Sequence, residues 1–152
     1  MIVPKIIGAS VFSLVFRGLG GDTRIEGILA AMPGGADGAL IFVMVLVFIL
    51  GFVLDFVEIS IIVLPVVGPT LMLLGHDPIW LSVLIAVNLQ TSFLTPPFGF
   101  SLFYLRGAAP AEISTAEIYR GVAPFVLLQI VGVALIWMFP AIATTLPRLL
   151  FG

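Results

Sequence analysis

Two groups of oxygen-bearing side chains interrupt an otherwise apolar sequence. The first is a pair of acids, Asp55 and Glu58, placed between two uncharged stretches. The second is a polar cluster that consists of Asn88, Gln90, Thr91, Ser92 and Thr95. This cluster lies just before two prolines and a glycine, Pro96, Pro97 and Gly99. Polar groups beside a break in an apolar helix are typical of an ion or substrate site in a membrane transporter.

The proline pair interrupts a run that is otherwise long enough to cross a membrane. The uncharged run 78–105 has 28 residues, which would span about 42 Å as a helix, whereas a bilayer core is about 30 Å thick. Pro97 removes a backbone donor and clashes with the preceding turn, and it disfavours the α conformation at Pro96. Broken backbone at membrane depth is tolerated only inside protein or along a cavity. The run therefore predicts a discontinuous helix.

Composition is typical of an all-α integral membrane protein. Of the 152 residues, 61% are hydrophobic and 9% are charged, against about 25% charged residues in soluble domains, and the mean hydropathy is +1.31. The net charge of −2 argues against a surface for nucleic acid, and the lack of cysteine excludes thiol chemistry. One histidine, His76, argues against a histidine-based triad. Asp55 and Glu58 lie too close on one segment to be the two facing acids of an aspartyl-type enzyme, so we predict neither catalysis nor an organic cofactor.

The first half of the chain predicts two helices and a helical hairpin. The helices are expected at 2–19 and 23–32, the second with Asp22 as its N-cap and lying at the membrane interface. A re-entrant hairpin is expected at 38–75 with the two acids near its tip. Each apolar half is short for a full crossing, and an acid near the bilayer centre costs about 2.5–3.5 kcal/mol. The alternative is two short crossings with the acids in a tight loop.

The second half predicts the broken helix and one further span. The broken helix is expected at 78–105, with Asp77 as its N-cap. Ser114 and Glu117 form a capping-box pattern, and the last helix is expected at 121–140. All 152 residues are thus predicted to form one multi-pass membrane domain. The Lys and Arg residues divide three against three between its two sides, so charge does not orient it.

Two segments of the chain resemble a known family. They are DFVEISIIVLP at 55–65 and GHDPIWLSVLIAVNLQTSFLTPPFGFSLFYLRG at 75–107. In sequence and spacing they resemble the large membrane subunit of tripartite ATP-independent periplasmic (TRAP) transporters, the DctM-like permeases of bacteria and archaea. That subunit is several times longer and has two inverted-topology halves, each with a re-entrant hairpin and a discontinuous helix. The chain resembles only its C-terminal part, so we expect a fragment of an inverted-repeat transporter.

The resemblance implies secondary uptake of small organic acids, such as C4-dicarboxylates or keto acids, driven by a sodium gradient across the cell (inner) membrane. The implied partners are a small membrane subunit and a periplasmic substrate-binding protein. The implied sodium-site residues are Asp55, Thr95, Pro96, Phe98 and Gly99. The residues expected to bind substrate or line the site are Glu58, Asn88, Gln90, Thr91, Ser92 and Pro97. We expect no metal other than sodium.

Structural roles stay open for several of these residues. Asn88 and Gln90 could be hydrogen-bond partners between helices. Thr91 and Ser92 can bond back to their own helix and be structurally silent. For the whole chain, the rival interpretation is a membrane protein with a structural or assembly role and no transport activity. In that case, substitutions of the site residues would be tolerated.

Overall fold

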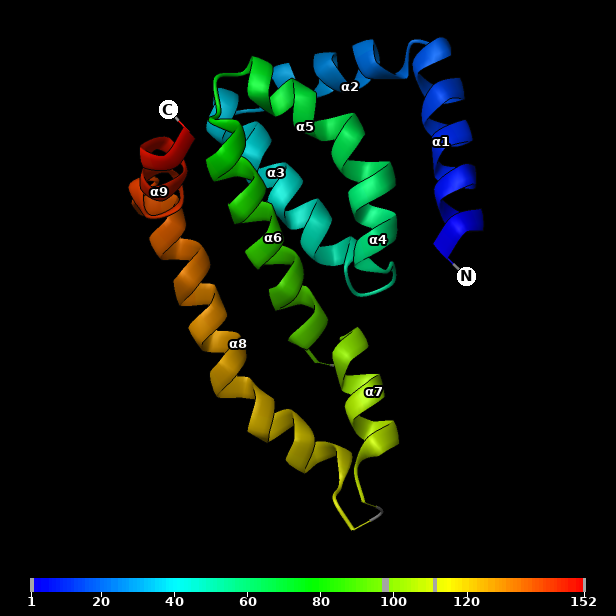
Figure 1. The fold of residues 1–152 in the computed structure, drawn as a ribbon, viewed down its shortest axis with the longest axis vertical. Coiled ribbons are helices and arrows are strands. Elements are labelled where there is room, and N and C mark those ends of the chain that lie inside the picture. The colour runs from blue at the N-terminus through cyan, green and yellow to red at the C-terminus, as the bar shows by residue number, and fades with distance from the viewer. Residues whose placement is uncertain (1, 97–98, 111, 152) are drawn as a thin grey trace. The chain divides into compact units, whose positions relative to one another are not determined.

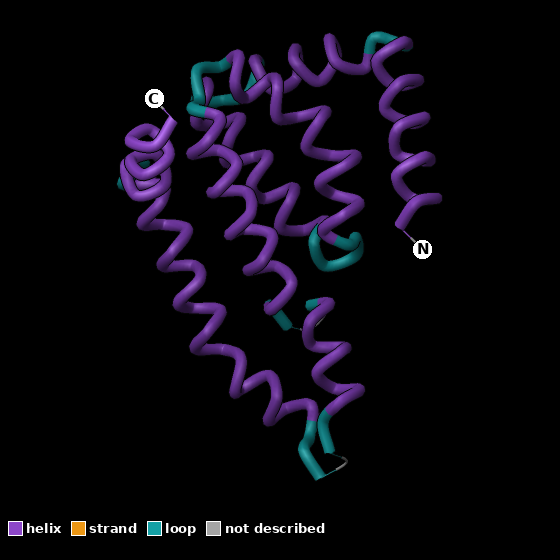
Figure 2. The backbone as a smooth tube through the Cα atoms, viewed as in Figure 1, coloured by secondary structure: helices purple, strands orange, loops and turns teal. Residues whose placement is uncertain are grey.

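The computed structural model describes residues 2–96, 99–110 and 112–151, and the regular elements in that part of the chain are all helical (Figure 1, Figure 2). This confirms the prediction of an all-helical chain. The elements are α1 (Ile2–Gly18), α2 (Gly21–Ala30), α3 (Gly35–Leu50), α4 (Phe56–Glu58), a π-helical turn η1 (Ile59–Val63), α5 (Leu64–Leu73), α6 (Pro78–Leu94), α7 (Phe100–Ala108), α8 (Thr115–Met138) and α9 (Ala141–Phe151).

Where the sequence predicted one membrane domain, the chain divides into two compact units. The first unit contains Met1–Val47 and Leu54–Asp77, and the second contains Phe48–Val53 and Pro78–Gly152. In the first unit, α1 packs against η1 and α2 packs against α5. In the second unit, α6 packs against α7, α8 and α9. Each unit is described on its own below.

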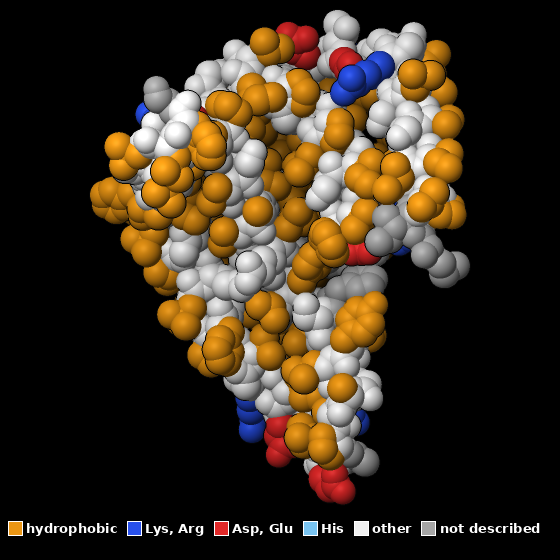
Figure 3. All heavy atoms as spheres, in the orientation of Figure 1, with side chains coloured by type: hydrophobic (Ala, Val, Ile, Leu, Met, Phe, Trp, Pro, Cys, Tyr) orange, Lys and Arg blue, Asp and Glu red, His pale blue; other side chains and the backbone are white. Residues whose placement is uncertain are grey.

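Several helices have the length and composition of membrane spans. The continuous helical segment Phe56–Leu73 and the helix α8 qualify individually, and α1 with α2 gives a third candidate that is bent by 75°. The helices α3, α6 and α9 are apolar but shorter. Many large apolar side chains of α8 are exposed, including Phe125 and Leu128, and Figure 3 shows hydrophobic side chains over its outer surface. These features agree with a membrane protein, whereas the re-entrant path of 38–75 stays a prediction.

The junction between α1 and α2 differs from the sequence prediction. The helix α2 begins at Gly21, and its N-cap is Gly20, which adopts a left-handed conformation with φ of +73°. The expectation that Asp22 is the N-cap is therefore wrong, because Asp22 lies inside the first turn. Its carboxylate is instead 3.6 Å from Nε of Arg17. The left-handed conformation of Gly20 therefore separates the end of α1 at Gly18 from the start of α2 at Gly21, which comes before Asp22.

Arg17 also binds a carbonyl that a proline leaves without its usual donor. In an α-helix, the Pro65 carbonyl would accept a hydrogen bond from the N–H of residue 69, but Pro69 has no N–H. The Arg17 guanidinium lies at this carbonyl, and Nη2 donates to the Pro65 oxygen at 3.2 Å. Unpaired carbonyls are costly in an apolar environment. Arg17 therefore stabilises the helical segment Phe56–Leu73 at the point where Pro69 removes a hydrogen bond.

The same helical segment contains a wider turn just before Pro65. In η1, the Leu64 N–H donates to the Ile59 carbonyl, five residues earlier, in place of the usual four. Pro65 lacks an N–H and its ring clashes with the turn before it, which favours this widened geometry. Such π-bulges are found frequently at functional sites.

In the second unit, Trp80 has a role like that of Arg17. Its indole Nε1 donates to the Ile136 carbonyl at 2.7 Å, and the expected donor four residues later is Pro140, which has no N–H. The ring of Trp80 also packs edge-to-face against Trp137, with centroids 5.9 Å apart. These contacts hold the start of α6 against the end of α8.

The helix α8 begins earlier than the sequence predicted. Ser114 is its N-cap and Glu117 completes the capping box, which confirms that pattern. The expected start of the last helix at 121 is wrong, because one helix runs from Thr115 to Met138. It passes through Pro124, which lies in its interior. The capping box therefore starts the span itself, not a separate short helix.

We expect Arg17→Met to lower the free energy of unfolding by about 1–3 kcal/mol, because it leaves the Pro65 carbonyl without a donor. In a Pro69→Ala background, residue 69 regains an N–H that can bond to that carbonyl. There the same Arg17→Met substitution should cost much less. Titration with SDS in mixed micelles measures the free energy of unfolding of the four proteins in this double-mutant cycle.

The matched control for this cycle is Arg24→Met, because Arg24 is an exposed cation on the neighbouring helix α2. It should leave the free energy of unfolding within about 0.5 kcal/mol of the wild type. An equal cost of Arg17→Met in both backgrounds would contradict the carbonyl role and attribute the effect to the ion pair with Asp22.

Candidate functional site

Asp55 and Glu58 lie together where the α3–α4 connection ends. The helix α3 ends at Leu50, and Asp55 is the N-cap of α4 with an extended backbone, φ −69° and ψ 151°. Glu58 is the third residue of that helix, and its Oε2 accepts a 3.4 Å hydrogen bond from the Asp55 N–H. A capping box therefore holds the two acids at the start of the apolar segment Phe56–Leu73. Asp55 and Glu58 are therefore close neighbours in the structure.

Lys5 is a neighbour of both acids that the sequence analysis missed. Its Nζ lies 2.9 Å from Oε1 of Glu58 and 4.0 Å from Oδ2 of Asp55. The three side chains are partly exposed, with exposed fractions of 45% for Lys5, 35% for Asp55 and 28% for Glu58. The signal in the sequence was a cation near the start of an apolar N-terminal helix, whose other cation is Arg17. Two carboxylates thus share one ammonium, and the group keeps one excess negative charge.

The side-chain oxygens at this turn come from the two carboxylates of Asp55 and Glu58. Among the described residues, no group of three or more His, Cys, Asp and Glu side chains could hold a metal ion. Asp55 and Glu58 provide hard carboxylate oxygens, and sodium is a hard cation. Lys5 already binds at these oxygens, so a cation that enters must share them with the ammonium or displace it.

The hydroxyl groups near the end of α6 all bond back to their own helix. Thr91 donates to the Val87 carbonyl at 2.8 Å and Ser92 to the Leu89 carbonyl at 2.7 Å. Thr91 and Ser92 thus bond back to their own helix as expected, whereas their site-lining role stays a prediction. Thr95 donates in the same way to the Thr91 carbonyl at 2.7 Å. A hydroxyl that donates its hydrogen keeps its oxygen lone pairs, so Thr95 remains able to bind a cation.

The two amides of the polar cluster lie in different environments. Asn88 is buried, with 7% of its surface exposed, whereas Gln90 is exposed. A buried Asn in an apolar helix requires hydrogen-bond partners. This burial fits an interhelical hydrogen bond and also a site-lining role, so both interpretations of Asn88 stay predictions. The exposure of Gln90 leaves its predicted role untested.

The break between α6 and α7 is built around Thr95 and Gly99. The Thr95 N–H donates to the Ser92 carbonyl at 3.2 Å, and the Gly99 N–H donates to the Thr95 carbonyl at 3.1 Å. Pro96 lies in the turn after α6, while the predicted site residues Pro97 and Phe98 are outside the described part of the chain. Gly99 is buried and is the N-cap of α7. One hydrogen bond between residues four apart therefore spans the break, between Thr95 and Gly99.

Gly99 also permits a close approach of backbone to backbone. A Cβ atom placed on Gly99 would lie less than 3.0 Å from the Phe93 carbonyl oxygen and 2.9 Å from the Phe93 carbonyl carbon. Real Cβ atoms are essentially never found at such distances. The glycine is therefore required by space and not by its backbone angles, because its φ is −52°.

The predicted sodium site draws on both units of the chain. Asp55 and Glu58 belong to the first unit, and the residues from Asn88 to Gly99 belong to the second. Within the first unit, the structure brings the two acids together and adds Lys5. Within the second, it brings Thr95 and Gly99 together. The combination of both groups in one site stays a prediction.

Comparison with known proteins gives one family. The model described as "Tripartite ATP-independent periplasmic transporter, DctM component" matches residues 1–142. The C4-dicarboxylate TRAP transporter large permease protein DctM of Vibrio cholerae is 34% identical over 60% of this chain and 20% of its own length. The ectoine/5-hydroxyectoine large permease protein UehC of Ruegeria pomeroyi is 32% identical over 99% of this chain and 35% of its own length. The sialic acid permease protein SiaT of Haemophilus influenzae is 31% identical over 84% of this chain and 20% of its own length.

These relatives are much longer than the present chain, which spans only a fifth to about a third of their length. No solved structure gives a significant match.

Proposed function

Because the chain belongs to the DctM component family of tripartite ATP-independent periplasmic transporters, we propose that it forms part of a membrane permease for sodium-coupled uptake of small organic acids. The names of its relatives mention C4-dicarboxylates, sialic acid, ectoine and isethionate. The first three compounds carry a carboxylate group, and isethionate is a sulfonate. The proposal commits to a carboxylate as substrate class, because three of these compounds carry one, and leaves the particular acid open.

The observation that carries the ion and substrate chemistry is the arrangement of helix ends at the break. The helix α6 ends at Leu94 and α7 begins at Phe100. A helix C-terminus carries partial negative charge and suits a cation, whereas an N-terminus carries partial positive charge and suits a carboxylate. A break in one helix therefore offers both kinds of group within a few residues.

The acids at the start of α4 add the charge that a sodium site needs. Asp55 would supply a carboxylate ligand, and Thr95 and the carbonyls near the break would supply neutral oxygens. Glu58 binds Lys5 at the shorter distance, which leaves Asp55 as the better candidate of the two for the ion. In this proposal, Lys5 keeps the turn from carrying two unbalanced negative charges when no ion is bound.

The proposed partners follow the family. A small membrane subunit would pack with the permease in the bacterial or archaeal inner membrane, and a periplasmic binding protein would deliver the acid. The exposed apolar faces of α8 are suited to lipid or to such a subunit. Because this chain covers only part of its relatives, the remaining permease segments belong to the same functional assembly.

The test is uptake of labelled acids into proteoliposomes that contain the chain with the other membrane segments of its permease, the small subunit and the binding protein. The panel contains a C4-dicarboxylate, sialic acid and ectoine. We expect uptake of at least one acid only with an inward sodium gradient, and none when potassium replaces sodium or the binding protein is omitted. A well-folded complex that takes up no acid under any gradient would contradict the proposal and favour a structural role.

A further inference from the structure

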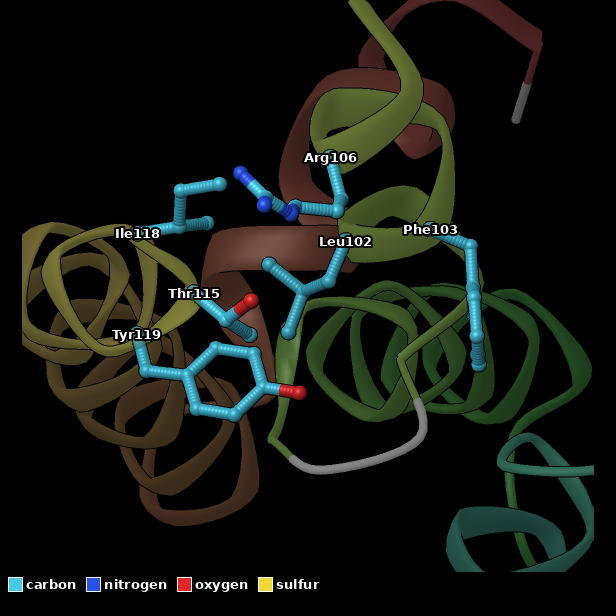
Figure 4. A pocket seen from close by; sticks show the side chains of 6 residues that line it. All are labelled: Leu102, Phe103, Arg106, Thr115, Ile118 and Tyr119. Carbon is cyan, nitrogen blue, oxygen red and sulfur yellow. The ribbon is translucent and has the colours of Figure 1, made fainter. Parts of the chain in front are cut away.

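The second unit contains a cavity of about 230 Å³ between the end of α7 and the start of α8. It is lined by Leu102, Phe103, Arg106, Thr115, Ile118 and Tyr119. Figure 4 shows Leu102 and Arg106 reaching from α7 toward Thr115, Ile118 and Tyr119 of α8. A volume of this size holds several waters or one polar head group, since a water molecule occupies about 30 Å³ in the liquid. The described residues of the predicted sodium and substrate sites do not line this cavity.

The lining changes from apolar to polar across the cavity. Leu102 and Ile118 are buried, whereas Arg106 and Thr115 are exposed. Tyr119 contributes an aromatic ring and a hydroxyl group. The cavity therefore has a buried apolar inner wall and an exposed rim that contains the charge of Arg106. We propose that it binds the head group of an anionic phospholipid, with the phosphate at Arg106.

Arg106 is held in place for such a contact. Its Nη1 donates to the Ile113 carbonyl, which ties the guanidinium to the connection between the two helices. The other N–H groups of a guanidinium still form a fork that matches two phosphate oxygens. A side chain that is already positioned loses less conformational freedom when it binds a ligand.

The charges around the cavity favour an anion. Among the described residues that line it, Arg106 is the one charged side chain. The nearby acid Glu117 is engaged elsewhere, because its Oε2 accepts from the Ser114 N–H at 2.7 Å and from the Ser114 hydroxyl at 2.8 Å. The capping box thus binds the carboxylate of Glu117 to the start of its own helix.

The position of the cavity favours a lipid over a soluble anion. Arg106 lies in the last turn of α7, just before the connection to α8, and the exposed apolar side chains Phe103, Tyr104 and Leu105 come immediately before it. Such a change from apolar to charged residues marks a membrane–water boundary, where Arg and Tyr are enriched. In Figure 3, charged side chains gather where α7 meets α8 and hydrophobic side chains cover the helices beyond. Acyl chains can therefore lie along α7 while the phosphate reaches Arg106.

Native mass spectrometry of the complex released from detergent micelles tests this proposal. With phosphatidylglycerol and phosphatidylcholine offered at equal concentration, we expect the wild type to retain phosphatidylglycerol and Arg106→Gln to retain at least about fivefold less, equivalent to about 1 kcal/mol. Arg24→Gln is the matched control, because it removes an exposed cation far along the sequence and should change retention less than twofold. Equal retention by the Arg106→Gln protein and the wild type would overturn the proposal.

Two further measurements do not depend on the folding of a variant. A photoreactive phosphatidylglycerol bound to the wild-type complex should form crosslinks within residues 102–119, and crosslinks confined to other segments would contradict the site. Inorganic phosphate in millimolar excess should leave the bound lipid in place. Displacement of the lipid by inorganic phosphate would instead assign the cavity to a soluble anion and overturn the choice of a lipid.

Discussion

Replacing Asp55 with asparagine should raise the sodium concentration that the reconstituted transporter needs for uptake. The substitution keeps the size of the side chain and its ability to cap α4, because asparagine is as good an N-cap as aspartate. It removes one negative charge from the turn that α4 shares with Lys5. By analogy with hydrogen bonds to charged groups, which contribute about 1.5–3 kcal/mol, we expect sodium to bind about 10- to 150-fold more weakly.

The control for Asp55→Asn is Asp37→Asn. Asp37 is an exposed acid in the first turn of α3, so this substitution makes the same chemical change in a similar helical position. The sodium concentration that gives half-maximal uptake should rise for Asp55→Asn and stay unchanged for Asp37→Asn. If Asp55→Asn shows the wild-type dependence on sodium, the ion binds without this carboxylate and the assignment of Asp55 is wrong.

Replacing Gly99 with alanine should destabilise the transporter by about 1–3 kcal/mol, the usual cost of forcing an extra methyl group into a packed site. The new Cβ would contact the backbone carbonyl of Phe93 in the last turn of α6, and a backbone carbonyl cannot move aside as easily as a flexible side chain. We also expect uptake to fall, because the break between α6 and α7 would change its geometry.

Gly107→Ala separates this steric effect from the general effect of a glycine-to-alanine change. Gly107 lies in α7, and a Cβ there meets nothing within 4 Å. Alanine is the better helix former by about 0.5–1 kcal/mol, so Gly107→Ala should be neutral or stabilising. SDS titration measures the free energy of unfolding of both variants. Similar values for the two would mean that the Phe93 carbonyl moves away at little cost.

Features set by local chemistry could be predicted from the sequence. The capping box at Ser114 and the start of the broken helix at Pro78 depend on neighbouring residues, and the structure contains both. The end of α6 at Leu94 follows from the backbone restrictions that Pro97 imposes on Pro96. The predicted helix starts were wrong where two local sequence signals favour different boundaries. At the start of α2 a left-handed Gly20 acts before Asp22, and in α8 an interior Pro124 is tolerated.

Contacts between distant residues could not be predicted in this way. Arg17 meets the Pro65 carbonyl across 48 positions of sequence, and Trp80 meets the Ile136 carbonyl across 56. Each contact requires a particular packing of two helices, which hydrophobic periodicity does not specify. For the candidate site, the neighbouring acids could be read from the sequence, whereas their counterion Lys5 depends on how α1 packs against η1.

Lys5 also sets the formal charge of the turn at Asp55 and Glu58. With all three groups ionised, one positive and two negative charges leave a net charge of −1 on the turn. A single bound monovalent cation would make it neutral. Moving one unit charge across the full membrane against a potential of 100 mV costs about 2.3 kcal/mol of free energy. If the turn moves across the membrane during transport, the potential would therefore act on the turn without a bound cation. It would exert no net force on the turn that has one cation bound.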